Sequence, residues 1–316
     1  MQKHHRLKTK IIALCLLFAA KTWAHPGAGI VVDKYGRVYF VLSGGPHNRI
    51  ILIDAHGKVT PFIVDERLHA PHHLIIDQKG NLYTVSANDG IVWKIAPDGM
   101  MTEFYSSQNE DNLWRIGAWG NPFTIDQQGN IYSIDDSSRV RILKITPEGK
   151  INILAGSEKG YADGKSNEAK FGDLHSAAMV WGPEKLLYIT DGSRIRKVAS
   201  DGTVSTLAIS QGARLGYGAG IAIDARRNVY VADIYYRQIL KITPEGKSTR
   251  LAGLSKGSIA EKTKEDVRLL MPTGIAIDRA GNIYVLDNSP EVTRVWKIAP
   301  NGKFFMFASG NNVLTN

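Results

Sequence analysis

A phrase of ten residues recurs six times along the chain, and it limits the possible folds more than any other feature. It reads apolar-x-apolar-Asp-x-x-Gly-Asn-apolar-Tyr, as in LIIDQKGNLY at 74–83. A second phrase, such as ILKITPEGK, follows each copy. Each phrase predicts two short antiparallel strands about a tight turn, so each unit supplies four strands. The copies end in Tyr39, Tyr83, Tyr132, Tyr188, Tyr230 and Tyr284.

Six such units predict an all-β fold, a six-bladed β-propeller of four-stranded antiparallel blades. Sheets of this length cannot each bury both faces alone, whereas a radial arrangement buries them against one another. Helical solenoids are excluded because no segment keeps a 3.6-residue period beyond a turn or two. The expected blades span approximately 27–64, 68–106, 116–157, 170–210, 215–255 and 269–310.

The turns of the repeat are expected to be tight, and one unit departs from the common turn sequence. The turn of the second phrase requires a positive φ, which a β-carbon resists, and all six copies carry glycine there. In the fourth unit Gly182-Pro183-Glu184-Lys185 replaces the Asp-x-x-Gly turn, a change expected to alter only that hairpin. The six turn glycines are Gly57, Gly99, Gly149, Gly202, Gly246 and Gly302.

Residues 1–24 have the order of a secretory signal peptide. Residues 2–10 are basic, residues 11–20 are apolar, and a small residue, Ala24, ends the segment. The apolar run is too short to cross a hydrocarbon core of about 30 Å, so membrane insertion is not expected. The sequence therefore predicts cleavage after Ala24, a periplasmic or secreted location, and a single propeller domain over 25–316.

The basic charge of the chain comes in large part from this segment. The full chain carries 39 Lys+Arg against 30 Asp+Glu, a formal charge of +9. Cleavage would remove five basic residues and no acid, leaving 34 against 30, or +4. The single cysteine, Cys15, would leave too, which excludes a disulfide framework and a thiolate-rich metal site. Nucleic acid is not an expected partner, because an exported chain does not meet it and the remaining lysines are spread over turns.

Several motifs resemble NHL repeats. PTGIAID at 272–278 and YVAD at 230–233 have the form of these repeats, and the linker with GYADG at 154–171 is similar to a connection common in bacterial NHL proteins. The resemblance covers essentially all of 27–310. It implies the propeller fold and leaves the function open, because unrelated sites are built on such scaffolds.

The long connections mark the face on which a functional site is expected. We call the strands of a blade A to D from the channel outward. The A–B and C–D turns are short and uniform, whereas the D–A connections are long and share the opposite face with the B–C loops. Binding residues on rigid scaffolds usually lie on such loops. The candidate ligand-binding rim on this face consists of Trp114, Arg115, Trp119, Asn121 and Tyr217, with Tyr161, Tyr235 and Tyr236 as an extension.

Histidines converge on the same rim. Neutral imidazole is a common metal ligand and a near-neutral acid–base group, so a divalent metal site is one hypothesis. The alternative is that His72 and His73 pack in a tight channel mouth and His25 begins a loose terminus. Because adjacent strand residues point to opposite sides, His72 and His73 are not expected to bind one ion together. The metal hypothesis involves His25, His72, His73 and His175.

Four B strands end in an aspartate three residues after the repeat tyrosine. Such a ring could hold calcium or perform acid–base chemistry. Its repetition favours a structural role instead, as caps of the B–C turns, because a catalytic group is seldom needed in every repeat. These residues are Asp135, Asp191, Asp233 and Asp287.

Two classes of function remain open. Gluconolactonase-like propellers, which the chain resembles distantly, hold Ca²⁺ with carboxylates and amides at the channel mouth; here that position reads Ala28, His72, Asn121, Ala177, Ala219 and Thr273. A lactonase of that design is therefore disfavoured, and a hydrolase with a histidine-bound metal stays possible. We favour a monomeric binding module for a protein, peptide or small ligand, with the identity of any cofactor open.

Overall fold

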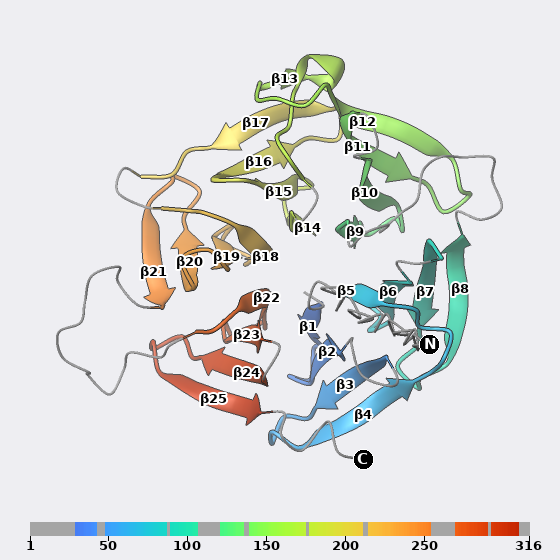
Figure 1. Cartoon of the computed structure of the whole chain (residues 1–316), viewed down its shortest axis with the longest axis vertical. Helices are drawn as coiled ribbons and strands as arrows, with labels where there is room; N and C mark the ends of the chain where they lie inside the picture. The colour runs from blue at the N-terminus through green and yellow to red at the C-terminus, as the bar shows by residue number, and fades with distance from the viewer. Residues whose placement is uncertain are drawn as a thin grey trace, which may run out of the picture.

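A computed structural model describes residues 29–42, 48–86, 89–106, 121–135, 139–174, 177–210, 214–253, 269–289 and 292–309. It confirms the predicted all-β six-bladed propeller. Six antiparallel sheets stand radially about a central axis, and the chain passes once round the ring (Figure 1). The repeat strands of each sheet pair in chain order, with the first strand innermost. None of the described segments forms a helix long and apolar enough to cross a membrane.

Blades 1 to 3 contain four strands each. Blade 1 consists of β1 (Ile30–Val32), β2 (Val38–Leu42), β3 (Arg49–Ile53) and β4 (Val59–Val64). Blade 2 consists of β5 (Pro71–Ile76), β6 (Leu82–Ser86), β7 (Ile91–Ile95) and β8 (Met101–Ser106). Blade 3 consists of β9 (Phe123–Ile125), β10 (Ile131–Asp135), β11 (Val140–Ile145) and β12 (Ile151–Ser157).

Blade 4 has a fifth strand that the repeat pattern does not predict. The linker after blade 3 forms β13 (Gly164–Lys165) and the 3₁₀ helix η3 (Ser166–Glu168), and β13 pairs with the outer edge of blade 4. The other strands of blade 4 are β14 (Met179–Trp181), β15 (Leu187–Asp191), β16 (Arg194–Val198) and β17 (Thr203–Leu207). Blade 5 consists of β18 (Gly218–Ile223), β19 (Val229–Asp233), β20 (Gln238–Ile242) and β21 (Ser248–Ala252). Blade 6 consists of β22 (Pro272–Ile277), β23 (Ile283–Asn288), β24 (Thr293–Ile298) and β25 (Phe304–Ser309).

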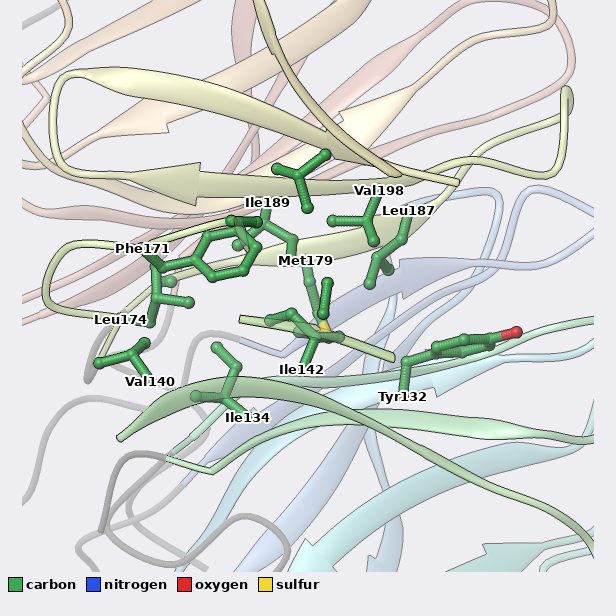
Figure 2. Close-up of a cluster of buried hydrophobic side chains, with 14 residues drawn as sticks. Tyr132, Ile134, Val140, Ile142, Phe171, Leu174, Met179, Leu187, Ile189 and Val198 are labelled. Atoms are coloured by element: carbon green, nitrogen blue, oxygen red, sulfur yellow. The ribbon is translucent and has the colours of Figure 1, made fainter. Parts of the chain in front are cut away.

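Buried apolar side chains gather between neighbouring blades. In the cluster between blades 3 and 4, Tyr132 and Ile142 of one sheet face Leu187 and Ile189 of the next, and Phe171 of the linker closes one side (Figure 2). Five further clusters among the described residues fill the remaining junctions of the ring. Each blade is thus half of two cores, which is why no blade is expected to fold alone.

The ring closes by side-chain packing between its two ends. All four strands of blade 1 and all four of blade 6 come from consecutive segments, so no strand is exchanged between the ends. Instead, Ile30 and Phe40 of blade 1 pack with Ala276, Tyr284 and Val295 of blade 6 in one buried cluster. This junction therefore depends on the same apolar contacts as the other five.

The A–B turns explain the spacing of the repeated phrase. In blade 5, Asp224 Oδ1 accepts hydrogen bonds from the backbone N–H groups of Arg226 and Asn228, at 2.9 and 2.8 Å. Asp224 Oδ2 accepts from Asn228 Nδ2 at 2.7 Å and from the Tyr230 hydroxyl at 3.0 Å. Burial opposes the charged form of Asp224, but these bonds outweigh it and lower the pKa of the carboxyl. Burial and the neighbouring carboxylate raise the pKa of Tyr230. The aspartate, asparagine and tyrosine thus form one hydrogen-bonded unit.

In the fourth unit the repeat tyrosine also donates to a carboxylate, but that of a glutamate. Its turn lacks the aspartate, but the Tyr188 hydroxyl donates to Glu184 Oε1. The hairpin still pairs in register, with Val180 opposite Tyr188. A carboxylate two positions further along the turn therefore replaces the missing one, because a glutamate side chain is longer by one methylene.

Two cations occupy turn positions that suit glycine. Four A–B turns carry glycine with φ between +77° and +87° at the fourth position of the turn, whereas Arg227 and Lys185 take that position in blades 5 and 4 with φ of 65° and 63°. A left-handed conformation costs an L-residue roughly 1–2 kcal/mol. The two turns are therefore strained at these residues.

We predict that Arg227→Gly stabilises the protein by about 1 kcal/mol, because glycine adopts this φ without strain. The matched control is Arg226→Gly one residue earlier, where φ is not positive. There glycine adds only freedom to the unfolded chain and costs about 0.5 kcal/mol. Urea unfolding midpoints of both variants provide the test, and equal shifts in one direction would contradict the prediction.

Candidate functional site

The face formed by the D–A connections and B–C loops, the D–A/B–C face, is anchored by the aspartates that end the B strands. Asp135, Asp191, Asp233 and Asp287 are at most 6% exposed. Buried carboxylates require hydrogen-bond donors, and backbone N–H groups supply most of them here. How each carboxylate is satisfied decides which loops of this face are fixed.

Asp233 holds two loops of blade 5 together. Its carboxylate accepts from the backbone N–H groups of Gly216 at 2.9 Å and Tyr217 at 3.1 Å, in the segment that enters the blade. It also accepts from the N–H of Tyr236 at 3.2 Å, in the B–C loop, and from Gln238 Nε2 at 3.2 Å. One fully buried side chain therefore sets the relative position of both loops.

These two loops present a cluster of tyrosines, Tyr217, Tyr235 and Tyr236. Tyr235 is 67% exposed and Tyr217 is 37% exposed. The rings of Tyr235 and Tyr236 meet edge to face at 4.8 Å, and the Tyr235 side chain lies against Gly216, where a β-carbon would come within 2.8 Å of it. Burial, together with the nearby charge of Asp173, raises the pKa of Tyr217. The cluster is thus an aromatic surface on a backbone that hydrogen bonds hold in place.

Blade 4 fixes its entering segment with an arginine that sequence analysis did not single out. Arg196 is fully buried and donates to Asp191 at 2.8 Å, to Asp163 at 2.9 Å, and to the carbonyls of Ala162 and Lys170. Asp191 also accepts from the backbone of the linker, at Gly172. These bonds hold the GYADG linker on blade 4. The linker motif was visible in the sequence, but its partner lies on another strand and carries no signal of its own.

The remaining B-strand aspartates differ in their partners. Asp287 accepts from the backbone N–H groups of Leu270 and Met271 and from Trp296 Nε1, whereas Asp135 is paired with Arg141 at 2.6 Å. The sequence assigned such aspartates to the B–C turns. The backbone N–H groups that bond Asp191 and Asp287 belong instead to the segment that enters the blade, because that segment crosses directly over the end of the B strand. Asp233 also accepts from Tyr236 in the B–C loop, as expected.

The candidate rim is described only in part. Trp114, Arg115 and Trp119 lie outside the described residues. Asn121 is 2% exposed, and its Nδ2 is 3.5 Å from the Ile134 carbonyl, so its side chain is directed into blade 3 rather than to the surface. Tyr217 lies on blade 5, and blade 4 separates it from Asn121 along the ring. Of the proposed rim residues, the structure therefore places Tyr217 at an accessible surface.

The histidines of the metal hypothesis are likewise divided. His25 and His175 lie outside the described residues, while His72 and His73 are half-buried in β5. The His73 ring meets Phe123 of blade 3 edge-on at 6.5 Å. The β5–β6 register shifts between Pro71 and Leu74, and this bulge removes the strict alternation used to separate the two side chains.

No group of three or more His, Cys, Asp or Glu side chains suited to a metal ion occurs among the described residues. Because two of the four histidines lie outside that part of the chain, the metal hypothesis stays a prediction. The fold and the accessible loops define a six-bladed β-propeller with an aromatic loop surface.

Comparison with known proteins supports the fold. No protein-family model matches the chain. Teneurin-m of Drosophila melanogaster is 24% identical over 328 aligned residues, which cover 90% of this chain and 12% of Teneurin-m. The chain thus spans about an eighth of that relative.

Three solved propellers have similar folds. Virginiamycin B lyase from Staphylococcus aureus has a TM-score of 0.55 and 18% identity over 90% of this chain and 85% of its own. A streptogramin B lyase has a TM-score of 0.57 and 17% identity over 89% and 82%. The gluconolactonase XC5397 from Xanthomonas campestris has a TM-score of 0.57 and 10% identity over 88% and 85%. At these identities the similarity shows the propeller fold alone.

We predict that Asp233→Ala destabilises the protein by about 3 kcal/mol, because it leaves several buried N–H groups without an acceptor. Asp201→Ala is the control: Asp201 also accepts a backbone hydrogen bond, from Thr203, but in an exposed C–D turn. There water replaces the lost acceptor, so the unfolding midpoint should move much less than in Asp233→Ala. Chemical unfolding measures both, and equal losses would show that Asp233 does not anchor the loops.

Proposed function

We propose that the chain is an exported, monomeric, NHL-type binding module that engages a protein, peptide or small ligand through its D–A/B–C face. The observation that carries this proposal is the tyrosine cluster of blade 5. Tyr217 and Tyr235 are exposed, yet the loops that bear them are fixed by a buried carboxylate. Nucleic acid is not part of the proposal.

Tyrosine suits this role for physical reasons. Its ring offers a large apolar contact area and its hydroxyl a hydrogen bond, and ordering it restricts only two side-chain torsions. Because the backbone beneath it is already ordered, binding would cost little further entropy. Loops on a rigid scaffold are the usual position of binding residues, and the cluster lies on two such loops.

The test uses the protein purified after export, whose mass is expected to lack residues 1–24. Ligands selected on it from a random peptide library and a glycan array are then measured against two variants. We expect the double variant Tyr217→Ala/Tyr235→Ala to lose at least about tenfold in affinity, or about 1.4 kcal/mol.

The matched control is Tyr35→Ala. Tyr35 is 65% exposed, but lies in the A–B turn of blade 1, on the opposite face. It should change affinity less than about twofold. Equal losses in both variants, or selected ligands indifferent to the double variant, would contradict the proposal.

A hydrolase or lyase with its site at the channel mouth is the second candidate. His72 and His73 lie in the bulge of an innermost strand, and a near-neutral imidazole there could act as a general base or bind a metal. The lyases and gluconolactonase with this fold make such a reaction worth testing, although their similarity extends to the fold alone.

Metal content and turnover of lactones, aryl esters and the streptogramin quinupristin, with and without chelator, separate the two candidates. If the chain is an enzyme of this kind, His72→Ala should lower the rate at least about 100-fold. His56→Ala, in a C–D turn, should leave it unchanged. Absence of both metal and turnover would eliminate this candidate.

A further inference from the structure

The face formed by the A–B and C–D turns, opposite the tyrosine cluster, also carries an organised feature. The A–B and C–D turns of all six blades lie among the described residues. A pocket of about 220 Å³ opens here between the A–B turns of blades 6, 1 and 2. The pocket is thus separate from the tyrosine cluster, which lies on the other face.

The floor of the pocket is apolar. It includes Val32, Ile76 and Ile277, the last residues of the innermost strands β1, β5 and β22. All three side chains are half-buried. The pocket therefore lies beside the channel, where the inner strands end and the turns begin.

The carboxylates that line the pocket are directed into their own turns. Asp33 accepts from two backbone N–H groups and from Arg37, which pairs with it at 2.6 Å. Asp77 accepts from the backbone and side chain of Asn81, and Asp278 is bonded in the same way by Asn282. These bonds occupy both oxygens of each carboxylate. The carboxylates are thus bonded within their own turns; Asp33 is buried, whereas Asp77 and Asp278 are half-buried.

Apart from Arg37, the cations of the same turns that line the pocket are exposed. Lys34, Lys79 and Arg279 line the pocket and are exposed. No ion pair joins any of them to another of the described residues. One comes from each of the three blades, so the rim of the pocket carries cations on three sides while its floor is apolar.

We propose that this pocket binds a small organic anion, a molecule with a carboxylate or phosphate group and an apolar body. The anionic group would lie among Lys34, Lys79 and Arg279, and the body would cover the apolar floor. Charge-assisted hydrogen bonds to an oxyanion are about twice as strong as neutral ones, and guanidinium and ammonium groups both donate them. The volume suits a ligand of one or two rings rather than a macromolecule.

The probes are 1-naphthyl phosphate and 1-naphthoate, with neutral 1-naphthol and inorganic phosphate as partial ligands. Binding is measured by calorimetry at low ionic strength, where screening is weak. We expect each naphthyl anion to bind at least about tenfold more tightly than naphthol or phosphate, because only the complete probe uses both the rim and the floor. The two anions together distinguish a carboxylate from a phosphate preference.

Two triple variants make the test specific. Lys34→Gln/Lys79→Gln/Arg279→Gln removes the cations of the rim and should weaken binding at least about tenfold. Lys150→Gln/Lys247→Gln/Lys303→Gln removes the same charge from C–D turns outside the pocket and should change it less than about twofold. Circular dichroism checks that both variants are folded.

Three results would overturn the proposal. Equal losses in the two variants would show diffuse attraction to a basic face rather than a site. Equal binding of naphthol would show that the rim takes no part, and no binding of either anion up to about 5 mM would show that no site exists. Because Tyr217→Ala/Tyr235→Ala should not affect naphthyl phosphate, the two proposals can fail separately.

Discussion

The apolar contact between one blade and the next is the interaction on which the whole structure depends. Each sheet has two buried faces, and each face packs against a neighbouring sheet. The apolar burial that stabilises the protein is therefore divided among six clusters and not gathered in one core. The junction between blades 6 and 1 is the critical case, since no strand is shared across it and Phe40 and Tyr284 must meet by packing alone. A propeller closed in this way tolerates variation on its two faces, because most of the contacts that hold the ring lie between strands, with a few added by connections, as Phe171 does.

Carboxylates fix the connections at each end of the sheets, whereas apolar residues hold the sheets together. On one face, the first aspartate of the repeat closes the A–B turn and orients the repeat tyrosine; on the other, the B-strand aspartate fixes the segment that enters the blade. Both accept backbone N–H bonds, and both leave the outer residues of their turn free to vary. Tyr235 and Lys79 are therefore exposed although the backbone around them is hydrogen-bonded to a carboxylate.

The repeated phrase predicted the fold because its period, its turn residues and its alternation all describe one unit, and six units permit few arrangements. What it could not predict came from side-chain partners and strand register that the repeat does not encode. Arg196 has no motif, and its partners lie up to 34 residues away along the chain. Glu184 replaces an aspartate through the length of its side chain, and the bulge at His72 arises from register, which alternation alone does not reveal. Of the candidate rim residues, Tyr217 lies at an accessible surface, whereas Asn121, which the sequence placed at the rim, is buried.

The two faces differ in how they could recognise a ligand. The tyrosine cluster offers aromatic area at the edge of long connections, which suits an extended partner whose contacts spread over several loops. The pocket of the opposite face is bounded by short, fixed turns, so its shape can change little, and selectivity there must come from charge and size. Arg227 and Lys185 extend the basic character of that face to blades 5 and 4, in backbone conformations that disfavour them. Backbone strain of this kind persists only where the surrounding structure imposes it or where a function uses the side chain. The strained positions of Arg227 and Lys185 therefore agree with a functional role for positive charge on this face.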